Sequence, residues 1–374
     1  MSMPKNSKIA IILGTRAELI KTFPVMLELK KKKISYYFIH TGQHNLKDLC
    51  EKFGVKKPDI TLTKESVKSS KFNSKELKAI LWNLGLLFKI KKELKSLKNL
   101  KYVLYHGDTM TTFTSSLASS KLFNSKKTYK NVHLEAGLRS FNLFEPFPEE
   151  ISRIIAGSFS KILFAPSVLS KHHLRKKRNK EIYLVGNTIV DSALHSLELA
   201  KKKKVKIISK KKFALITIHR HENLKSKKRL TKIVEILNSI PINSYFAMHT
   251  NTEKKLKEFG LYEKLMKNKK IKIMPPMDYP EFIAQLEKCS LIVCDGGSMQ
   301  EESLIFGKPC VVLRMATERQ EGLITNFQYL SKLDVGKTNE KIKEYLSPEF
   351  KIKKFKNPYG EKGVSKKIVE VLKK

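Results

Sequence analysis

Three carboxylate residues in the first half of the chain could carry out acid–base chemistry. Asp108 lies in the sequence His-Gly-Asp-Thr, at the end of the apolar run YVLYH. Glu135 follows the run VHL and precedes Ala-Gly-Leu-Arg, and Glu149 lies in a Pro-Glu-Glu sequence that we expect in a loop. Carboxylates that share a crevice can be driven apart in pKa, which supplies one base and one acid. Asp108 has a second explanation, because an Asp at the start of a helix is commonly only an N-cap.

Two polar clusters in the second half follow apolar runs in the same way. His219 follows the run ALITI and precedes Arg-His-Glu, a concentration of charge that is costly to maintain without a ligand. The turn Gly296-Gly297-Ser298 follows the run LIVCD. Its glycines permit close approach of the backbone, and a helix that starts there would offer its N–H groups to a diphosphate. Ser298 and Glu301 also match the S-x-x-E capping box, so helix initiation accounts for part of the motif, and we favour phosphate binding for the rest.

A further polar turn, Gly14-Thr15-Arg16, follows the first apolar run and opens a helix that carries Lys21. We expect free backbone N–H groups at this turn, and Arg16 and Lys21 add positive charge to it, which together favour an anion. A plain strand-to-helix turn explains Gly14 taken alone. The turn does not have the G-x-G-x-x-G pattern, so we expect no nicotinamide cofactor.

The elements that position these residues alternate along the whole chain. The apolar runs are KIAIIL, SYYFIH, YVLYH, VHLEA, ILFAP and IYLVG in the first half, and FALITIH, YFAMH, IKIMPP, LIVCD and CVVLR in the second, after a Lys-rich helical segment near 194–212. This alternation predicts an α/β fold with two Rossmann-like, doubly wound parallel sheets, whose ligands bind beyond the carboxyl ends of the strands. We expect an N-terminal domain at 1–170, a C-terminal domain at 171–361, and a last helix at about 362–374 that packs back on the first domain.

The composition limits the classes of partner. The chain of 374 residues has 75 Lys and Arg against 35 Asp and Glu, a formal net charge of +40. Such a charge is typical of polyanion binding, but the lysines are spread over every helical stretch without interleaved aromatic residues, so we expect no nucleic-acid partner. No apolar run approaches the roughly 20 residues of a membrane span, and we expect no membrane insertion and no secretory signal. Four scattered cysteines predict a reducing, cytoplasmic location and no structural metal.

Taken together, the order and spacing of these motifs resemble the UDP-N-acetylglucosamine 2-epimerase family over nearly the whole chain. The matching segments are Gly14–Glu18, His106–Thr109, Glu135–Arg139, Pro148–Glu150, Gly186–Thr188, His219–Glu222, Gln300–Glu302, Gly307–Pro309, Thr317–Arg319 and Asn357–Gly360. The resemblance implies a fold similar to that of the GT-B glycosyltransferases, with the active site in the cleft between the domains. It also implies a reaction without metal or other cofactor.

The resemblance further implies a reaction and a role for each candidate residue. In this family a base removes the C2 proton of the sugar while UDP leaves C1, and UDP then adds back to the 2-acetamidoglucal with the proton on the other face. Asp108, Glu135 and Glu149 would exchange protons, and His219 would contact the diphosphate or assist proton transfer. The substrate-binding residues would be Arg16, Lys21, Gly296, Gly297 and Ser298 for the diphosphate, Phe282 for the uracil, Glu302 for the ribose hydroxyls, and Arg319 to complete the nucleotide site.

Departures from the family pattern leave the preferred sugar open. Ala17 and Gln320 stand where the family has Pro, and Asp-Gly-Gly-Ser stands where Asp-Ser-Gly-Gly is usual. Glu135, Glu149 and His219, together with Asn-Pro-Tyr-Gly, favour the non-hydrolysing branch. The alternatives are the hydrolysing branch, the branch that acts on UDP-diacetamido uronic acids, a GT-B glycosyltransferase, and a non-enzymatic polyanion-binding protein.

The resemblance also bears on regulation and assembly. Thr41–His44 matches a segment that helps non-hydrolysing members to bind a second, activating UDP-N-acetylglucosamine, whereas the adjoining stretch Lys64–Ser74 aligns poorly. Allosteric activation by this nucleotide sugar therefore remains open. Relatives are commonly homodimers, so we expect a homodimer.

Overall fold

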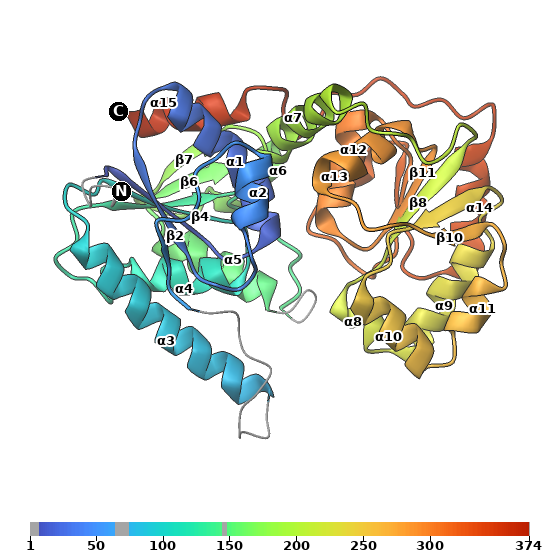
Figure 1. Ribbon diagram of the computed structural model, residues 1–374, viewed down its shortest axis with the longest axis horizontal. Helices are drawn as coiled ribbons and strands as arrows, with labels where there is room; N and C mark the ends of the chain where they lie inside the picture. Colours follow the sequence, from blue (N-terminus) through green and yellow to red (C-terminus); the bar gives the residue numbers. More distant parts are fainter. Residues whose placement is uncertain (1–6, 64–74, 144–147, 374) are drawn as a thin grey trace. The chain divides into compact units, whose positions relative to one another are not determined.

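The computed structural model describes residues 7–63, 75–143 and 148–373, so the poorly aligning stretch Lys64–Ser74 lies outside the described residues. The chain forms two compact units (Figure 1). The first combines Met1–Ser192 with Tyr359–Lys374, and the second is Ala193–Pro358.

The first unit is built on a parallel sheet of seven strands. In chain order they are β1 (Ile9–Leu13), β2 (Tyr36–His40), β3 (Ile60–Thr61), β4 (Tyr102–His106), β5 (Lys130–Leu134), β6 (Ile162–Ala165) and β7 (Glu181–Leu184), and their order in the sheet is β3-β2-β1-β4-β5-β6-β7. Every residue of β1, β2, β4 and β6 is buried. This is the pattern of a parallel sheet with both faces covered, and it explains why these strands are continuous apolar runs.

Helices connect these strands and cover the sheet (Figure 1). They are α1 (Arg16–Lys31), α2 (Lys47–Lys52), α3 (Lys75–Ser96), α4 (Met110–Ala118), α5 (Glu149–Phe159), α6 (Val168–Leu174), the start of α7 (Ile189–Lys202) and, from the end of the chain, α15 (Val364–Lys373). Helix α15 packs against α1, and the Nζ of Lys32 lies 3.4 Å from a carboxylate oxygen of Glu370.

The first unit extends beyond the expected boundary at residue 170. Strand β7 pairs in parallel with β6 and completes the sheet, and the first turn of α7 follows it. A boundary at 170 would separate paired strands of one sheet. The division therefore falls after Ser192, within α7, and the return crossing falls between Pro358 and Tyr359.

The second unit has a parallel sheet of six strands in the order β10-β9-β8-β11-β12-β13. The strands are β8 (Phe213–Thr217), β9 (Asn243–Phe246), β10 (Ile271–Ile273), β11 (Leu291–Cys294), β12 (Cys310–Val312) and β13 (Gln328–Leu330). The helices are α8 (His221–Leu224), α9 (Lys227–Asn238), α10 (Thr250–Glu258), α11 (Tyr262–Met266), α12 (Tyr279–Lys288), α13 (Gly297–Phe306), the 3-10 helix η1 (Gln320–Ile324) and α14 (Val335–Leu346). The predicted α/β class with two parallel sheets is confirmed.

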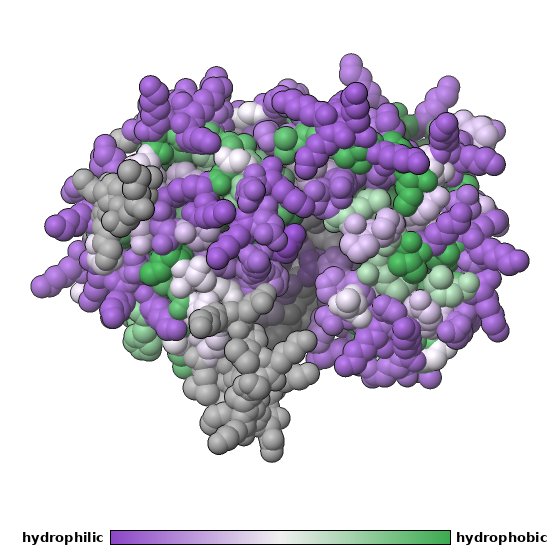
Figure 2. Space-filling view, in the orientation of Figure 1, coloured by the Kyte–Doolittle hydropathy of each residue, from purple (hydrophilic) through white to green (hydrophobic). Residues whose placement is uncertain are grey.

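The surface is dominated by polar side chains, as the composition requires. Figure 2 shows hydrophilic residues over much of the visible face, with smaller apolar areas between them. In the described parts of the chain, no helix is both long and apolar enough to cross a membrane. The Lys-rich stretch expected to be helical near 194–212 is helical only to Lys202.

Candidate functional site

The residue at the centre of the first unit's polar cluster is Glu135, directly after β5. Its backbone has a φ of 62°, a left-handed conformation that is uncommon outside glycine and asparagine. Its carboxylate forms a buried ion pair with Lys21 of α1, and the Nδ2 of Asn187 donates to the same oxygen, Oε2, at 2.9 Å. Glu135 is 8% exposed. A carboxylate that is buried to this extent remains charged only if such partners compensate the lost hydration.

Two buried histidines flank this carboxylate. The Nε2 of His106, at the end of β4, lies 4.0 Å from the Oε2 of Glu135. Burial lowers the pKa of His106 to about 4, while the charge of Glu135 acts in the opposite direction. Burial also lowers the pKa of His133, whose Nε2 lies 2.7 Å from the carbonyl oxygen of Gly107. Both rings are therefore neutral at pH 7.

Asp108 belongs to an ionic network beside this cluster. The Nη2 of Arg153 pairs with the Oδ2 of Asp108, and the Nη1 of Arg153 donates to the Oε2 of Glu150 at 3.0 Å. Arg139 and the backbone N–H of Ser140 also donate to Glu150, and these hydrogen bonds and charges outweigh its burial and lower its pKa. The His-Gly-Asp-Thr and Pro-Glu-Glu motifs are thus joined through Arg153. Thr109, and not Asp108, caps α4, since its Oγ1 accepts the N–H of Thr112 at 3.2 Å.

Glu149 and Glu150 correct one expectation. They do not lie in a loop but form the first residues of α5, after Pro148. Carboxylates are favourable in the first turn of a helix because they face the positive end of its dipole. Glu150 is fully buried in the network described above, whereas Glu149 keeps intermediate exposure.

The turn after β1 corrects a second expectation. The backbone N–H groups of Gly14 and Thr15 are not free, because they donate to the Oε2 of Glu18 at 2.8 and 2.7 Å. Burial raises the pKa of Glu18, and these hydrogen bonds oppose that shift. The other oxygen of Glu18 accepts from Thr109 at 2.6 Å and so links this turn to the loop after β4. Of the proposed anion ligands at this turn, Arg16 is exposed at the start of α1.

In the second unit, Asp295 organises the loop that carries His219. Its carboxylate accepts the backbone N–H of His219 at 3.0 Å, that of Arg220 at 2.9 Å, and the Nδ2 of Asn223 at 3.1 Å. Partial burial lowers the pKa of His219, and the neighbouring Asp295 opposes this shift. The side chain of His219 keeps 45% of its surface exposed, so it remains within reach of a ligand.

The glycine turn lies next to His219. A Cβ at Gly296 would be 3.1 Å from the Cε1 of His219, and one at Gly297 would be 2.6 Å from the guanidinium carbon of Arg319. Helix α13 begins at Gly297 with Gly296 as its N-cap, without a side-chain cap hydrogen bond. The capping box expected for Ser298 and Glu301 is therefore wrong, because the helix begins one residue before Ser298. The N-terminal N–H groups of α13 accordingly receive no bond from a capping side chain.

The remaining nucleotide candidates lie around α12 and α13. The Nε of Arg319 donates to Glu301 at 3.1 Å, and its guanidinium also pairs with Glu318. Glu302 is 2% exposed and accepts the hydroxyl of Tyr279 at 2.6 Å; burial and this carboxylate raise the pKa of Tyr279 well above its usual value. Phe282 is half-buried on α12 and packs against the core of the second unit.

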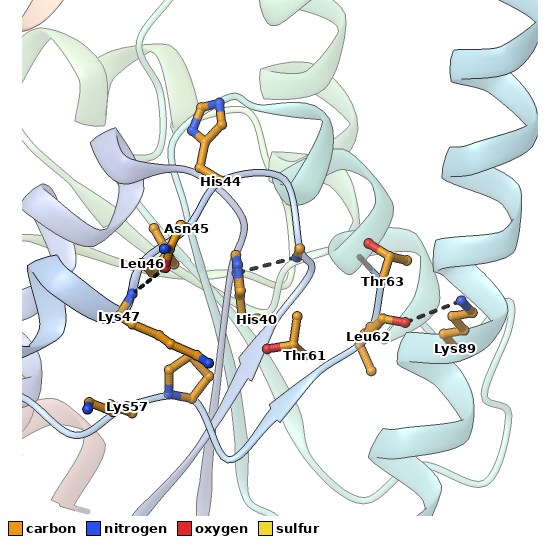
Figure 3. Close-up of a pocket in the computed structure, with 12 residues that line it drawn as sticks. His40, His44, Asn45, Leu46, Lys47, Lys57, Thr61, Leu62, Thr63 and Lys89 are labelled. Carbon is orange, nitrogen blue, oxygen red and sulfur yellow. Dashed lines mark hydrogen bonds between the residues drawn. The ribbon is translucent and has the colours of Figure 1, made fainter. Parts of the chain in front are cut away.

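A separate pocket of about 730 Å³ lies in the first unit, beyond β2 and β3 (Figure 3). It is lined by His40, Gly42, His44, Asn45, Leu46, Lys47, Lys57, Pro58, Thr61, Leu62, Thr63 and Lys89. None of the candidate catalytic residues is among them. Figure 3 shows Lys89 reaching from α3, where its Nζ donates to the carbonyl oxygen of Leu62 at 3.2 Å.

Sequence reasoning missed the residues that hold the candidates in place. Asn187 and Arg153 contact the predicted carboxylates, Glu18 joins two predicted motifs, and Asp295 fixes the His219 loop. Asn187 lies in the Gly-Asn-Thr segment, and Asp295 lies at the end of an apolar run. Both follow a predicted strand, and this position was the sequence signal that could have identified them as site residues. The structure brings Lys21 to Glu135. The roles of the site residues stay predictions.

Two tandem parallel-sheet units with polar clusters after their strands define a nucleotide-binding class of fold. The family model described as UDP-N-acetylglucosamine 2-epimerase matches residues 27–373, and the chain belongs to this family. The UDP-N-acetylglucosamine 2-epimerase of Methanococcus maripaludis is 37% identical over 381 residues, 98% of each chain. The UDP-2,3-diacetamido-2,3-dideoxy-D-glucuronate 2-epimerase of Pseudomonas aeruginosa is 33% identical, over 83% of this chain and 84% of its own.

The comparison of structures agrees. The crystal structure of the Methanocaldococcus jannaschii UDP-GlcNAc 2-epimerase, in complex with UDP-GlcNAc and UDP, has a TM-score of 0.80 and 33% identity. The match covers 98% of this chain and 99% of that one. The family resemblance and the GT-B-like fold expected from the motifs are therefore confirmed.

Proposed function

We propose that this protein is a UDP-N-acetylglucosamine 2-epimerase that interconverts UDP-N-acetylglucosamine and UDP-N-acetylmannosamine. The observation that carries the proposal is the buried Glu135 carboxylate, held by Lys21 and Asn187 beside the Asp108–Arg153 pair. Inversion at C2 requires proton removal and return on opposite faces of the carbon, and hence at least two acid–base groups. The family membership and the names of the two epimerase relatives support the same activity.

In the proposed mechanism, one carboxylate removes the C2 proton while the C1–O bond to UDP breaks. The electron pair of the C2–H bond forms the C1–C2 double bond of a 2-acetamidoglucal. UDP then adds to C1 while another acid returns a proton to the opposite face of C2. We assign these exchanges to Asp108, Glu135 and Glu149, because positioned acid–base groups contribute about 10²–10⁴-fold each to such steps.

The second unit would hold the nucleotide. The start of α13 at Gly297 and Ser298 offers backbone N–H groups, which suit the negative charge that develops on departing UDP. The neighbouring His219 ring would contact the diphosphate. We assign the uracil to Phe282 and the ribose hydroxyls to Glu302, and Arg319 would complete the nucleotide site.

The first test is NMR of the purified protein with UDP-N-acetylglucosamine in D₂O, following deuterium at C2 and free UDP together. Deuterated UDP-N-acetylmannosamine with little lasting UDP is the expected result, and it would assign the non-hydrolysing type that we propose. Stoichiometric UDP with free N-acetylmannosamine would assign the hydrolysing type. Absence of exchange would overturn the proposal for this sugar.

A second substrate is favoured by one observation. The Pseudomonas aeruginosa relative carries the name of an epimerase for a UDP-diacetamido glucuronate, at 33% identity. The same C2 elimination would serve that sugar. The D₂O assay repeated with UDP-2,3-diacetamido-2,3-dideoxyglucuronate decides between the two, since the preferred substrate is the one with the higher kcat/KM.

We also propose three properties beyond the reaction. The pocket of Figure 3 includes Gly42 and His44 and adjoins Gln43, which supports a second, regulatory UDP-N-acetylglucosamine there.

Leu84 and Phe88, one turn apart on α3, are 50% and 60% exposed, which supports a homodimer through that helix. The four cysteines are free and buried, which supports a reducing, cytoplasmic location.

A further inference from the structure

Asn187 has no part in the reaction as described, yet its side chain reaches Glu135. Asn187 is 1% exposed, and its Nδ2 donates to the Oε2 of Glu135, the oxygen that also receives Lys21. Its Oδ1 accepts the backbone N–H of Ile189 at 3.0 Å. Because a backbone N–H can only donate, the amide oxygen must face Ile189, and the NH₂ group must face the carboxylate.

The backbone of Asn187 is fixed by the last segment of the first unit. Its N–H donates to the carbonyl oxygen of Tyr359 at 2.8 Å, and Tyr359 is fully buried. The preceding residue, Gly186, has a φ of 99°, and a Cβ there would lie 2.6 Å from the same carbonyl oxygen. Only glycine permits this approach. The chain returns to the first unit at Tyr359, so the first residue after this crossing is the one that holds the backbone of Asn187.

A purely structural role does not account for the amide. An Asp at position 187 would accept the Ile189 N–H equally well, and its charge would suit the start of a helix better. The contact with Glu135 requires a donor, which the amide of Asn187 provides and a carboxylate would not. Since Glu135 has a left-handed backbone conformation, which is unfavourable for a residue with a side chain, partners must maintain its orientation.

We propose that Asn187 is a positioning residue that orients the Glu135 carboxylate and favours its ionised form for proton transfer. The proposal rests on the proposed function. It also gives the Asn-Pro-Tyr-Gly segment a part in the reaction, because Tyr359 holds Asn187 through its carbonyl oxygen.

The groups around Glu135 determine what a substitution at Asn187 should do. The charged and titratable groups close to it are Lys21 from α1, His106 at the end of β4 and His133 in β5. Asp108, in the loop after β4, acts on both histidines. Asn187→Asp keeps the shape and the bond from Ile189 but places a second carboxylate against Glu135. Ionisation of Glu135 then becomes less favourable, so the acidic limb of the kcat profile should move to higher pH.

The test compares Asn187→Asp and Asn187→Ala with a matched control, Asn131→Ala. Asn131 is also a fully buried asparagine of the first unit, but its Nδ2 donates to the carbonyl oxygens of Ser116 and Phe159. We expect kcat for C2 exchange to fall about tenfold to a hundredfold in both Asn187 variants, the range for loss of one hydrogen bond to a charged group. KM should change by less than about threefold, since the loss concerns only the chemical step. Asn131→Ala should leave the pH profile unchanged.

The outcomes separate this inference from the proposed function. If the unmodified protein exchanges C2 deuterium but Asn187→Asp has normal kcat and an unmoved acidic limb, the positioning role is overturned alone. Equal losses in Asn187→Ala and Asn131→Ala, with no movement of either profile, overturn it as well by assigning a structural role. Absence of exchange in the unmodified protein overturns the proposed function itself.

Discussion

The two units differ in the groups that their candidate sites present to a ligand. In the first, the candidate carboxylates Glu135 and Asp108 are each paired with a cation, Lys21 and Arg153, and two neutral histidines lie close by. In the second, the candidate anion site is a glycine turn at a helix N-terminus, and the neighbouring Arg319 is neutralised by Glu301 and Glu318. The first arrangement can exchange protons. The second offers fixed backbone donors to an anion.

The largest expected effect is on the proton-transfer groups of the first unit. Glu135→Gln should lower kcat by about 10²–10⁴-fold, the contribution of a positioned acid–base group, while UDP still binds. Asp108→Asn and Glu149→Gln should also lower turnover sharply. The matched control is Glu181→Gln, at a carboxylate whose partner is the surface residue Lys130, 2.8 Å away. Near-normal C2 exchange in all three site variants would contradict the acid–base assignment.

The second prediction concerns the glycine turn. Gly297→Ala places a methyl group 2.6 Å from the Arg319 guanidinium carbon, so the arginine or the helix start must move. Such overpacking displaces the N–H groups that we assign to the diphosphate, so we expect UDP affinity by calorimetry to fall about tenfold, which corresponds to about 1.4 kcal/mol of binding free energy. The control is Gly336→Ala in α14, where the added Cβ would lie an ordinary 3.7 Å from Asp334. Unchanged UDP affinity in Gly297→Ala would argue against phosphate binding at this turn.

The third prediction uses the pH dependence of stability. The pKa of His106 is lowered to about 4, so the unfolded chain binds its proton near pH 6.5 while the folded unit resists it. The contribution of neutral His106 to the free energy of unfolding is therefore fully present above pH 6.5, and it is lost as the pH falls towards 4. At pH 5 the loss from His106 alone should be about 2 kcal/mol.

Trp82 makes this loss measurable in one unit. It is the only tryptophan of the chain and packs against the core of the first unit, so its fluorescence during urea unfolding reports that unit. His106→Asn should flatten the dependence between pH 7 and 5. A first unit equally stable at both pH values would contradict the lowered pKa of His106, because it requires the folded and unfolded chains to bind its proton equally readily.

The smallest effect is expected from the surface lysines. Replacing Lys201–Lys204 with glutamine should change kcat/KM by less than about twofold at physiological salt, because exposed charges are screened there. The same change should weaken any binding to nucleic acid. Loss of C2 exchange in this variant would instead connect the lysine-rich surface with the activity.

The sequence predicted most strands because parallel strands covered on both faces are continuous apolar runs, as in β1, β4 and β11. It missed β3 and β13, whose residues Ile-Thr and Gln-Tyr-Leu include polar side chains and so do not form a continuous apolar run. The catalytic candidates were recognisable from motifs after strands. Their partners were not, because the contact of Glu135 with Asn187 joins residues 52 positions apart and depends on the fold alone.

The return of the chain to the first unit has a consequence for synthesis on the ribosome. Helix α15 and Tyr359, which complete the first unit, are translated after the whole of Ala193–Pro358. At about 5–20 residues per second, the nascent first unit waits on the order of ten seconds for its last segment. During that interval the face of α1 that α15 will cover is open to other nascent chains and to chaperones, and the second unit is free to fold first.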